Sequence, residues 1–328
     1  MKNLEFEYLG TVKKKTIKGI IRPSELAPFL GHKDGLNAFI ILLMYSVGAA
    51  CVYSAHVFKS IPYTILMMLI MGGLHNTLAT FIHEAAHGHV FSHKKVNDML
   101  GHFFFAAPLA TYLEDYRYLH WEHHRHTGKA GRDPELELYR AMGIRPTGYS
   151  QKEKVWVFIQ SIIGVHSIKG LIFLNKFFMS NRKNGNIKKP GLFEHGSIAF
   201  WYAVVPFIMW KMGMLASFLL VWLVPMFTVC MTFLLWHGFG EHIREKEGCL
   251  SQNTFTHKFD PLTKLFIYPI QSGYHLEHHL YPQLPWYNMA KFRKWAELRP
   301  EYKELASELE ADAYFYGKKT IVEMSFSE

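Results

Sequence analysis

The stretch "LNAFIILLMYSVGAACVYSAHVF", residues 36–58, contains no Lys, Arg, Asp or Glu. About 20 mostly apolar residues suffice for an α-helix to cross the ~30 Å hydrocarbon core of a bilayer. Residues 62–82, "PYTILMMLIMGGLHNTLATFI", are equally free of these four residue types, and only "KSI" separates the two stretches. The pattern predicts two membrane-spanning helices that form a hairpin.

A second pair of apolar stretches lies further along the chain, at 196–210 and 214–236, with "KMG" between them. We interpret it as a second hairpin of spanning helices. Two other apolar segments fit a span less well. Residues 99–113 are short for a span and are interpreted as re-entrant or interfacial. Residues 155–178 are interrupted near their middle by His166 and Lys169, which favours an interfacial or buried helix.

The distribution of positive charge orients these helices. The chain of 328 residues has a formal net charge of +9. The tight turns of the two hairpins, however, contain only one positively charged residue each, Lys59 and Lys211. Cytoplasmic loops of membrane proteins carry an excess of Lys and Arg. Both termini and the long segment 83–195 are therefore expected in the cytoplasm, and a bacterial inner membrane is the expected location.

Composition also argues against other classes of protein. The basic residues form no motif typical of a nucleic-acid-binding domain, so no nucleic-acid partner is expected. The three cysteines, Cys51, Cys230 and Cys249, have no C-x-x-C spacing. Neither a disulfide framework nor a thiolate metal site is indicated.

The predicted fold is an all-α integral membrane protein with four transmembrane helices in two hairpins and a cytoplasmic helical cap. Residues 1–328 are treated as one domain. Its parts are a cytoplasmic N-terminal arm (1–35), the first hairpin (36–82), a cytoplasmic and interfacial segment (83–195), the second hairpin (196–236) and a cytoplasmic C-terminal region (237–328).

Histidines are concentrated next to the span ends. Of 20 in the chain, nine lie between His83 and His126 and six between His237 and His279. Three motifs account for eight of them: "HEAAH" at 83–87, "HWEHH" at 120–124 and "HLEHH" at 275–279. On a helix, residues three or four apart share a face, whereas adjacent residues diverge by about 100°. We call these three motifs the first, second and third histidine boxes. The adjacent histidines of a box can therefore bind two different metal ions or hold one from two sides.

These histidine boxes suit two metal ions of a type that accepts imidazole ligands. The candidate ligands within them are His83, His87, His120, His123, His124, His275, His278 and His279. "HGFGEH", just after the fourth span, offers a ninth, and we favour His242 over His237. If residues 99–113 crossed the membrane, the first two boxes would lie on opposite faces, which further favours a re-entrant segment.

Carboxylates lie close to the boxes in sequence. A metal-bound imidazole normally donates its second N–H to a carboxylate or carbonyl. The candidates for this role are Glu84, Glu122, Asp133, Glu241 and Glu277. Alternatively, one of them bridges the two metals.

The motifs "HEAAH", "HWEHHRHTGKAGRDPE", "GEH" and "GYHLEHHLYPQLPWY" resemble the histidine boxes of the membrane fatty acid desaturase and hydroxylase superfamily. The resemblance covers roughly residues 36–290 and includes the order of boxes and paired spans. One departure is Gly273, where many members have Asn. The resemblance implies a non-haem di-iron centre with nine histidine ligands, namely the eight of the boxes and His242.

The resemblance also implies an oxidoreductase that uses O₂ to break an unactivated C–H bond of a fatty acyl or other lipid substrate. Desaturation is favoured; hydroxylation and oxidative decarboxylation to a terminal alkene are alternatives. Decarboxylation would need a cation for the free carboxylate, for which Arg117, Arg125 and Lys129 are candidates. No catalytic residue beyond the metal centre and no substrate-binding residue is assigned.

Two other classes of protein fit the histidine boxes less well. A metal-handling membrane protein would hold its ligands near mid-membrane, whereas these boxes lie at the span ends. A zinc hydrolase would need only three protein ligands, whereas this chain offers nine. The chain has no "HPGG" stretch and no cysteine cluster for an iron–sulfur centre. A separate electron carrier resembling ferredoxin, rubredoxin or cytochrome b5, with its reductase, is therefore expected.

Overall fold

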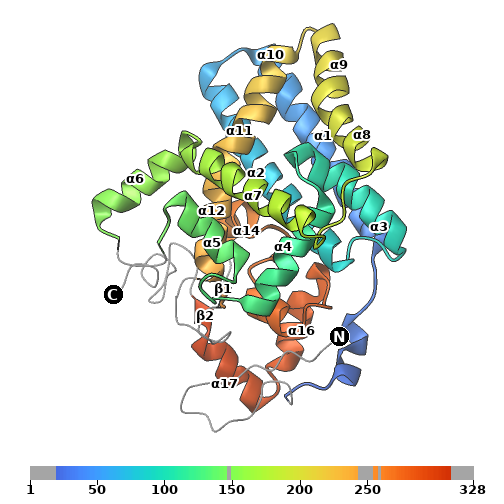
Figure 1. Cartoon of the computed structure of the whole chain (residues 1–328), viewed down its shortest axis with the longest axis vertical. Helices are drawn as coiled ribbons and strands as arrows, with labels where there is room; N and C mark the ends of the chain where they lie inside the picture. The colour runs from blue at the N-terminus through green and yellow to red at the C-terminus, as the bar shows by residue number, and fades with distance from the viewer. Residues whose placement is uncertain (1–19, 146–148, 243–253, 258–259, 312–328) are drawn as a thin grey trace. The chain divides into compact units, whose positions relative to one another are not determined.

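The computed structural model describes residues 20–145, 149–242, 254–257 and 260–311, which form two compact units. Unit 1 comprises residues 1–31, 119–151 and 236–328, and unit 2 comprises 32–118 and 152–235. Most of the expected N-terminal arm lies outside the described residues; within it, residues Pro23–Phe29 form a 3-10 helix. Figure 1 shows that the described residues are mostly helical.

Unit 2 contains the predicted spans. Helices α1 (Asp34–Phe58) and α2 (Ile61–His87) are each long and apolar enough to cross a membrane. The same is true of the helical runs Leu192–Lys211 and Leu215–Gly238. The first run comprises α8 (Leu192–Ala199), the π-helix Phe200–Val204 and α9 (Val205–Lys211). The second comprises α10 (Leu215–Phe218), the π-helix Leu219–Leu223, α11 (Val224–Phe227) and the start of α12 (Val229–Glu241).

Close packing of small residues brings two of these spans together. A Cβ atom added at Gly72 of α2 would lie 2.3 Å from Cγ1 of Val229 on α12. Helices in a membrane gain little from apolar burial and associate where small side chains let them approach. Gly72 therefore permits α2 to pack directly against α12.

The short apolar segment after the first box does not form a span. It consists of α3 (Lys94–Gly101), the π-helix His102–Ala106 and a 3-10 turn, Ala107–Leu109. Side chains from spanning helices donate to its carbonyls: the Tyr45 hydroxyl to Phe104 O at 2.6 Å and the Trp201 indole to Phe103 O at 2.8 Å. Irregular backbone at membrane depth needs such partners. The arrangement agrees with a re-entrant or interfacial segment.

The other apolar segment, residues 155–178, lies within two helices, α6 (Gln151–Ile162) and α7 (Val165–Lys183). The bend between them is 70°. Gly164 lies at the bend with a φ of +81°, a conformation that favours glycine. These helices are apolar enough to count as one broken span by composition. A bend of this kind occurs in a broken span as well as in a re-entrant loop, so the interfacial or buried position of this segment stays a prediction.

Unit 1 contains the second and third boxes. Its helices include the histidine-bearing end of α4 (Leu113–His126), α5 (Pro134–Met142), α14 (Pro261–Phe266), α15 (His275–Leu280), α16 (Met289–Ala296) and α17 (Pro300–Glu308). Short 3-10 turns lie at Pro269–Gln271 and Trp286–Asn288. Buried Leu284, Phe292 and Tyr302 form the centre of its core. One feature departs from an all-α fold: strands β1 (Thr256–His257) and β2 (Glu310–Ala311) pair in parallel.

Candidate metal centre

All three boxes are helical, as their spacing predicts. His83 and His87 lie in the last turn and a half of α2, which ends at Gly88 with a φ of +82°. The second box occupies the last turns of α4, and the third fills most of the short helix α15. In unit 1, six box histidines therefore approach one another from two helices that are distant in sequence.

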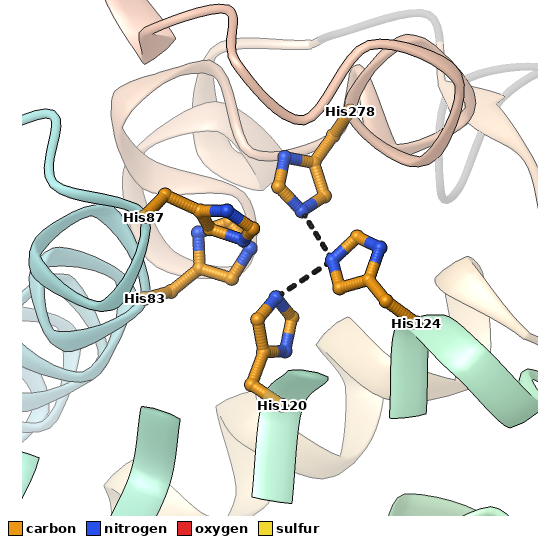
Figure 2. A group of neighbouring side chains, drawn as sticks. All are labelled: His83, His87, His120, His124 and His278. Carbon is orange, nitrogen blue, oxygen red and sulfur yellow. Dashed lines mark hydrogen bonds between the residues drawn. The ribbon is translucent and has the colours of Figure 1, made fainter. Parts of the chain in front are cut away.

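Three of these histidines form the first group within unit 1. The Nε2 atom of His124 lies 2.9 Å from Nε2 of His120 and 3.0 Å from Nε2 of His278. Figure 2 shows the three rings pointing toward one another, with His120 and His124 on α4 and His278 on α15. All three are at least 96% buried. We refer to His120, His124 and His278 as the three-histidine group.

The other box histidines of unit 1 meet His242. Nε2 of His275 lies 2.8 Å from Nε2 of His242 and 3.0 Å from Nε2 of His279. Nε2 of His279 in turn lies 3.3 Å from Nε2 of His123. The ligand atoms of all four residues lie within 4.8 Å of one another, a spacing that could hold a metal ion. We refer to His123, His242, His275 and His279 as the four-histidine group.

The adjacent histidines of the second and third boxes therefore separate. His123 belongs to the four-histidine group and His124 to the three-histidine group, and His279 and His278 divide in the same way. The sequence left two possibilities open: adjacent histidines contribute to two different sites, or they hold one metal ion from two sides. The geometry fits the first, because adjacent residues on a helix diverge by about 100°.

The first box lies in unit 2. The rings of His83 and His87 are 4.9 Å apart between centroids, as expected one turn apart on α2 (Figure 2). Nδ1 of His83 lies 3.2 Å from Oε1 of Glu84, whose other oxygen lies 3.3 Å from Nδ1 of His89. Glu84, a predicted carboxylate partner, thus contacts the ring of a candidate ligand.

Two other predicted carboxylates contact the outer nitrogens of box histidines. Oδ1 of Asp133 lies 2.9 Å from Nδ1 of His123, and Oε1 of Glu241 lies 2.9 Å from Nδ1 of His275. Asp133 also begins α5, since its side chain accepts hydrogen bonds from the backbone N–H groups of Glu135 at 3.0 Å and Leu136 at 3.4 Å. A residue in that role fixes both the helix start and the imidazole.

Glu135 was missed by the sequence analysis. Its Oε1 lies 3.3 Å from Nδ1 of His120, the same outer-nitrogen position that Asp133 takes at His123. The signal was present in "GRDPE", because an Asp-Pro pair begins a helix and places the following glutamate in its first turn. Only the packing of α5 against α4 brings that turn to His120.

Glu122 and Glu277 do not take the position expected for them. Glu122 pairs with Arg125 and lies 3.8 Å from His126, on the outer side of α4. Glu277 is fully buried and contacts Arg293, Tyr302 and Thr256. On a helix, the third residue of H-x-E-H-H points away from the face that its first and last histidines share.

The segment "HGFGEH" distinguishes its two histidines. His242 belongs to the four-histidine group, whereas Nε2 of His237 lies 2.7 Å from Oε1 of Glu241. The glycines allow tyrosines to pack against the backbone: a Cβ at Gly240 would lie 1.6 Å from the Tyr268 hydroxyl. The close approach fixes the end of α12 that bears Glu241.

Electrostatics act in opposite directions on the histidines of the four-histidine group. Burial favours the neutral imidazole of His123, but Asp133 and Glu135 outweigh it and raise the pKa of His123 to about 9. Burial and the neighbouring imidazoles hold the pKa values of His242 and His279 well below the ordinary histidine value. His242 and His279 therefore stay neutral and offer the lone pairs that bind metals, whereas a metal at His123 must first displace the proton on its Nε2.

The donor set fits a metal ion. Nδ1 of His123 and of His275 face carboxylates and so carry the ring proton, which leaves both Nε2 atoms as lone-pair donors directed into the group. Nitrogens ~2.1 Å from one first-row metal ion lie about 3 Å apart at a right angle. The observed separations of 2.8–3.3 Å match that geometry.

Comparisons with known proteins identify the class. The chain matches the model of the fatty acid desaturase family over residues 59–308, and it belongs to that family. It is therefore an oxidoreductase of a membrane protein family known for a di-iron centre.

Several relatives extend this finding. A dihydrorhizobitoxine desaturase of Bradyrhizobium elkanii is 27% identical over 292 residues, which cover 87% of this chain and 80% of that protein. A beta-carotene 4-ketolase of Protosiphon botryoides is 40% identical over 88 residues, or 26% of this chain and 22% of that protein. A beta-carotene ketolase of Haematococcus lacustris is 33% identical over 82 residues, or 24% of this chain and 25% of that protein. The last two matches span about a quarter of each relative.

Proposed function

We propose that this protein is an O₂-dependent di-iron enzyme that removes hydrogen from an unactivated C–H bond of a fatty acyl chain, most favourably to form a double bond. The observation that carries the proposal is the pair of buried histidine groups in unit 1, with only imidazole nitrogens directed inward. Iron accepts such ligands, and thiolates, which oxidants attack readily, are absent from these groups.

The proposed ligands follow from the geometry and from the family. His123, His242, His275 and His279 hold one iron. His120, His124 and His278 hold the other, and we propose that His83 and His87 of the first box complete its ligand set. Bound there, two iron ions would supply the activation of O₂ that C–H cleavage requires.

The chain's own residues have separate tasks in this proposal. Asp133, Glu135 and Glu241 fix the rings of His123, His120 and His275 and keep the proton on Nδ1, so that Nε2 remains a lone-pair donor. Burial of both groups excludes bulk water from the reacting region. The substrate chain would enter from the membrane, since the spans of unit 2 are apolar.

Among the alternative outcomes, oxidative decarboxylation has less support. Arg117, one candidate cation for a free carboxylate, donates to Ala86 O at 3.1 Å and pairs with Asp98 at 2.6 Å and with Glu114. Arg125 pairs with Glu122. Lys129 remains a candidate. Hydroxylation shares the first hydrogen abstraction with desaturation and stays the main alternative reaction.

A second substrate class is favoured by one comparison. The relative that matches most of this chain is named for dihydrorhizobitoxine rather than for a fatty acid. We therefore consider desaturation of a non-acyl metabolite as the second candidate function.

The cellular setting is part of the proposal. We infer a multi-pass protein of the bacterial inner membrane, with both termini and the histidine boxes on the cytoplasmic side. A separate ferredoxin-, rubredoxin- or cytochrome b5-like carrier with its reductase would deliver electrons to the basic cytoplasmic surface. Carrier-driven turnover that does not change with ionic strength would contradict electrostatic docking.

The experiment compares a host expressing this chain with one expressing His278→Ala, by mass spectrometry of lipids, polar metabolites and culture headspace. A new acyl double bond that is absent with the variant supports the proposal. A new hydroxyl, a volatile alkene or an altered non-acyl metabolite would replace it with the corresponding alternative. His278→Ala should also lose iron; a variant that keeps iron and activity would refute the ligand assignment.

A further inference from the structure

The second and third boxes share one sequence pattern, H-x-E-H-H, yet their glutamates occupy opposite environments. The Glu122 side chain is 23% exposed and pairs with Arg125, whose side chain is 58% exposed. The Glu277 side chain is 0% exposed and pairs with Arg293, whose side chain is 8% exposed. The same residue in the same motif is thus a surface carboxylate in one box and a buried charge in the other.

Glu277 connects the third box to three separate segments of unit 1. Its Oε1 accepts hydrogen bonds from Arg293 of α16 at 3.0 Å and from the Tyr302 hydroxyl of α17 at 2.7 Å. Its Oε2 accepts one from the hydroxyl of Thr256 in β1. Every hydrogen bond of this carboxylate therefore leads away from the histidine groups and into the C-terminal core.

Arg293 is itself held by further acids. Its guanidinium donates to Glu297 at 2.7 Å and to Glu310, the first residue of β2. Burial disfavours the charge, but Glu277 outweighs it and raises the pKa of Arg293 above the ordinary arginine value. A buried charge with several charged and hydrogen-bonded partners has a defined position, because each partner restrains it from a different direction.

Helix α15 supplies ligands to both histidine groups. His278 belongs to the three-histidine group, and His275 and His279 belong to the four-histidine group. The helix has only six residues, so it has little stiffness of its own and depends on tertiary contacts for its position. A shift of this one helix would move ligands of both groups together.

We propose that Glu277 is a positioning residue for both metal sites: through Arg293, Tyr302 and Thr256 it fixes α15, and with it His275, His278 and His279. Glu122 has no equivalent role, although the sequence pattern is identical. This inference rests on the proposed function for the presence of two metals. It concerns the affinity of the sites and the geometry of their ligands.

The test uses the full chain purified in detergent, stripped of metal and titrated with Co²⁺, whose visible absorption reports ligand geometry. Glu277→Gln preserves the size of the side chain and removes its charge, and Glu122→Gln is the matched control. Changing a partner that orients metal ligands typically weakens metal binding 10–100-fold. We expect Glu277→Gln to weaken Co²⁺ binding at least tenfold at both sites and Glu122→Gln to leave it within twofold.

Spectra separate positioning from loss of fold. Only protein that elutes as a single species in size-exclusion chromatography is titrated, so misfolded chains are removed. In Glu277→Gln saturated with Co²⁺, the absorption bands should shift, whereas a purely structural defect would lower the yield and leave the spectrum of the remaining protein unchanged. If Glu277→Gln gives no single species, Tyr302→Phe, which removes one hydrogen bond and no charge, should show a smaller change in the same direction.

The outcomes are distinct. Wild-type chain that binds fewer than two Co²⁺ ions overturns the proposed di-metal function and this inference with it. Wild-type chain that binds two, together with wild-type affinity and spectrum in the Glu277→Gln variant, or in Tyr302→Phe if it is the variant measured, overturns the inference alone. Weaker Co²⁺ binding at only one of the two sites would also overturn the inference, because α15 supplies histidines to both sites.

Discussion

Nδ1 of His123 lies 2.9 Å from Oδ1 of Asp133, and the same oxygen accepts the backbone N–H of Glu135 at 3.0 Å. One carboxylate thus begins α5 and orients a ring of the four-histidine group. Its second oxygen accepts the backbone N–H of Gly128 at 2.8 Å. The loop after the second box, the start of α5 and His123 are held together by a single residue.

The first prediction concerns this residue. Asp133→Asn should keep the start of α5, because asparagine caps helices as well as aspartate does. It removes the negative charge beside His123 and one acceptor for Gly128, so metal affinity at the four-histidine group should fall about tenfold or more. Metal titration of the purified protein measures this. Asp260→Asn is the control: Asp260 caps α14 in the same way, with bonds to Leu262 and Thr263 and no box histidine.

The second prediction concerns the carboxylate that the sequence analysis missed. Glu135→Gln should weaken metal binding roughly tenfold, at the low end for a ligand-orienting partner, because its distance of 3.3 Å to His120 is long. The three-histidine group should be affected more than the four-histidine group, because Oε2 of Glu135 lies farther, 3.7 Å, from Nδ1 of His123. Glu137→Gln, two residues on, changes a carboxylate that pairs with Arg140 at 2.9 Å and should have no effect. Equal affinities in both variants would show that Glu135 does not act through His120.

The third prediction concerns the glycine beside Glu241. Gly240→Ala should lower both the unfolding midpoint and the metal content, because its Cβ would lie 1.6 Å from the Tyr268 hydroxyl and 3.0 Å from Nε2 of His257. Tyr268→Phe in the same chain should restore part of the loss, since it removes the atom in closest conflict. Gly196→Ala, where nothing lies within 4 Å, should be neutral. Without any rescue by Tyr268→Phe, this contact is not the cause.

The fourth prediction concerns the end of α2. Arg117 donates to the carbonyls of Ala86 at 3.1 Å and Ala85 at 3.2 Å, within the helical turn that bears His87. Hydrogen bonds from a charged donor contribute about 2 kcal/mol to stability. Arg117→Met should therefore lower the unfolding midpoint, whereas Arg125→Met should not. If Arg117→Met changes only the KM for an acidic substrate, Arg117 binds substrate instead.

Much of the fold follows from local sequence. Stretches without Lys, Arg, Asp or Glu are long enough to cross a bilayer, and the four helices that could span it lie within a few residues of the predicted positions. The length and composition of an apolar stretch are enough to identify a candidate spanning helix, so no knowledge of distant contacts is needed. The helical boxes were likewise predictable, because i, i+4 spacing is a local feature. Asp133, expected as a carboxylate partner of a box histidine, contacts His123.

The site depended on tertiary structure wherever the sequence was ambiguous. His123 and His124 are neighbours in one motif, yet only the approach of α15 to α4 assigns them to different groups. Glu135 meets His120 because α5 folds back on α4, a contact that no local pattern encodes.

The pattern H-x-E-H-H, which occurs twice, shows most directly what the sequence determines and what the tertiary structure decides. The sequence by itself determined that residues 120–124 and 275–279 are helical turns with histidines on a shared face, because the histidine spacing follows the helical period. It gave both glutamates the same expected role. The tertiary structure decided that Glu122 stays at the surface and Glu277 is buried against Arg293 and Tyr302. The physical reason is that burial and ion pairing depend on which segments pack around a residue, and those segments lie far away in the chain.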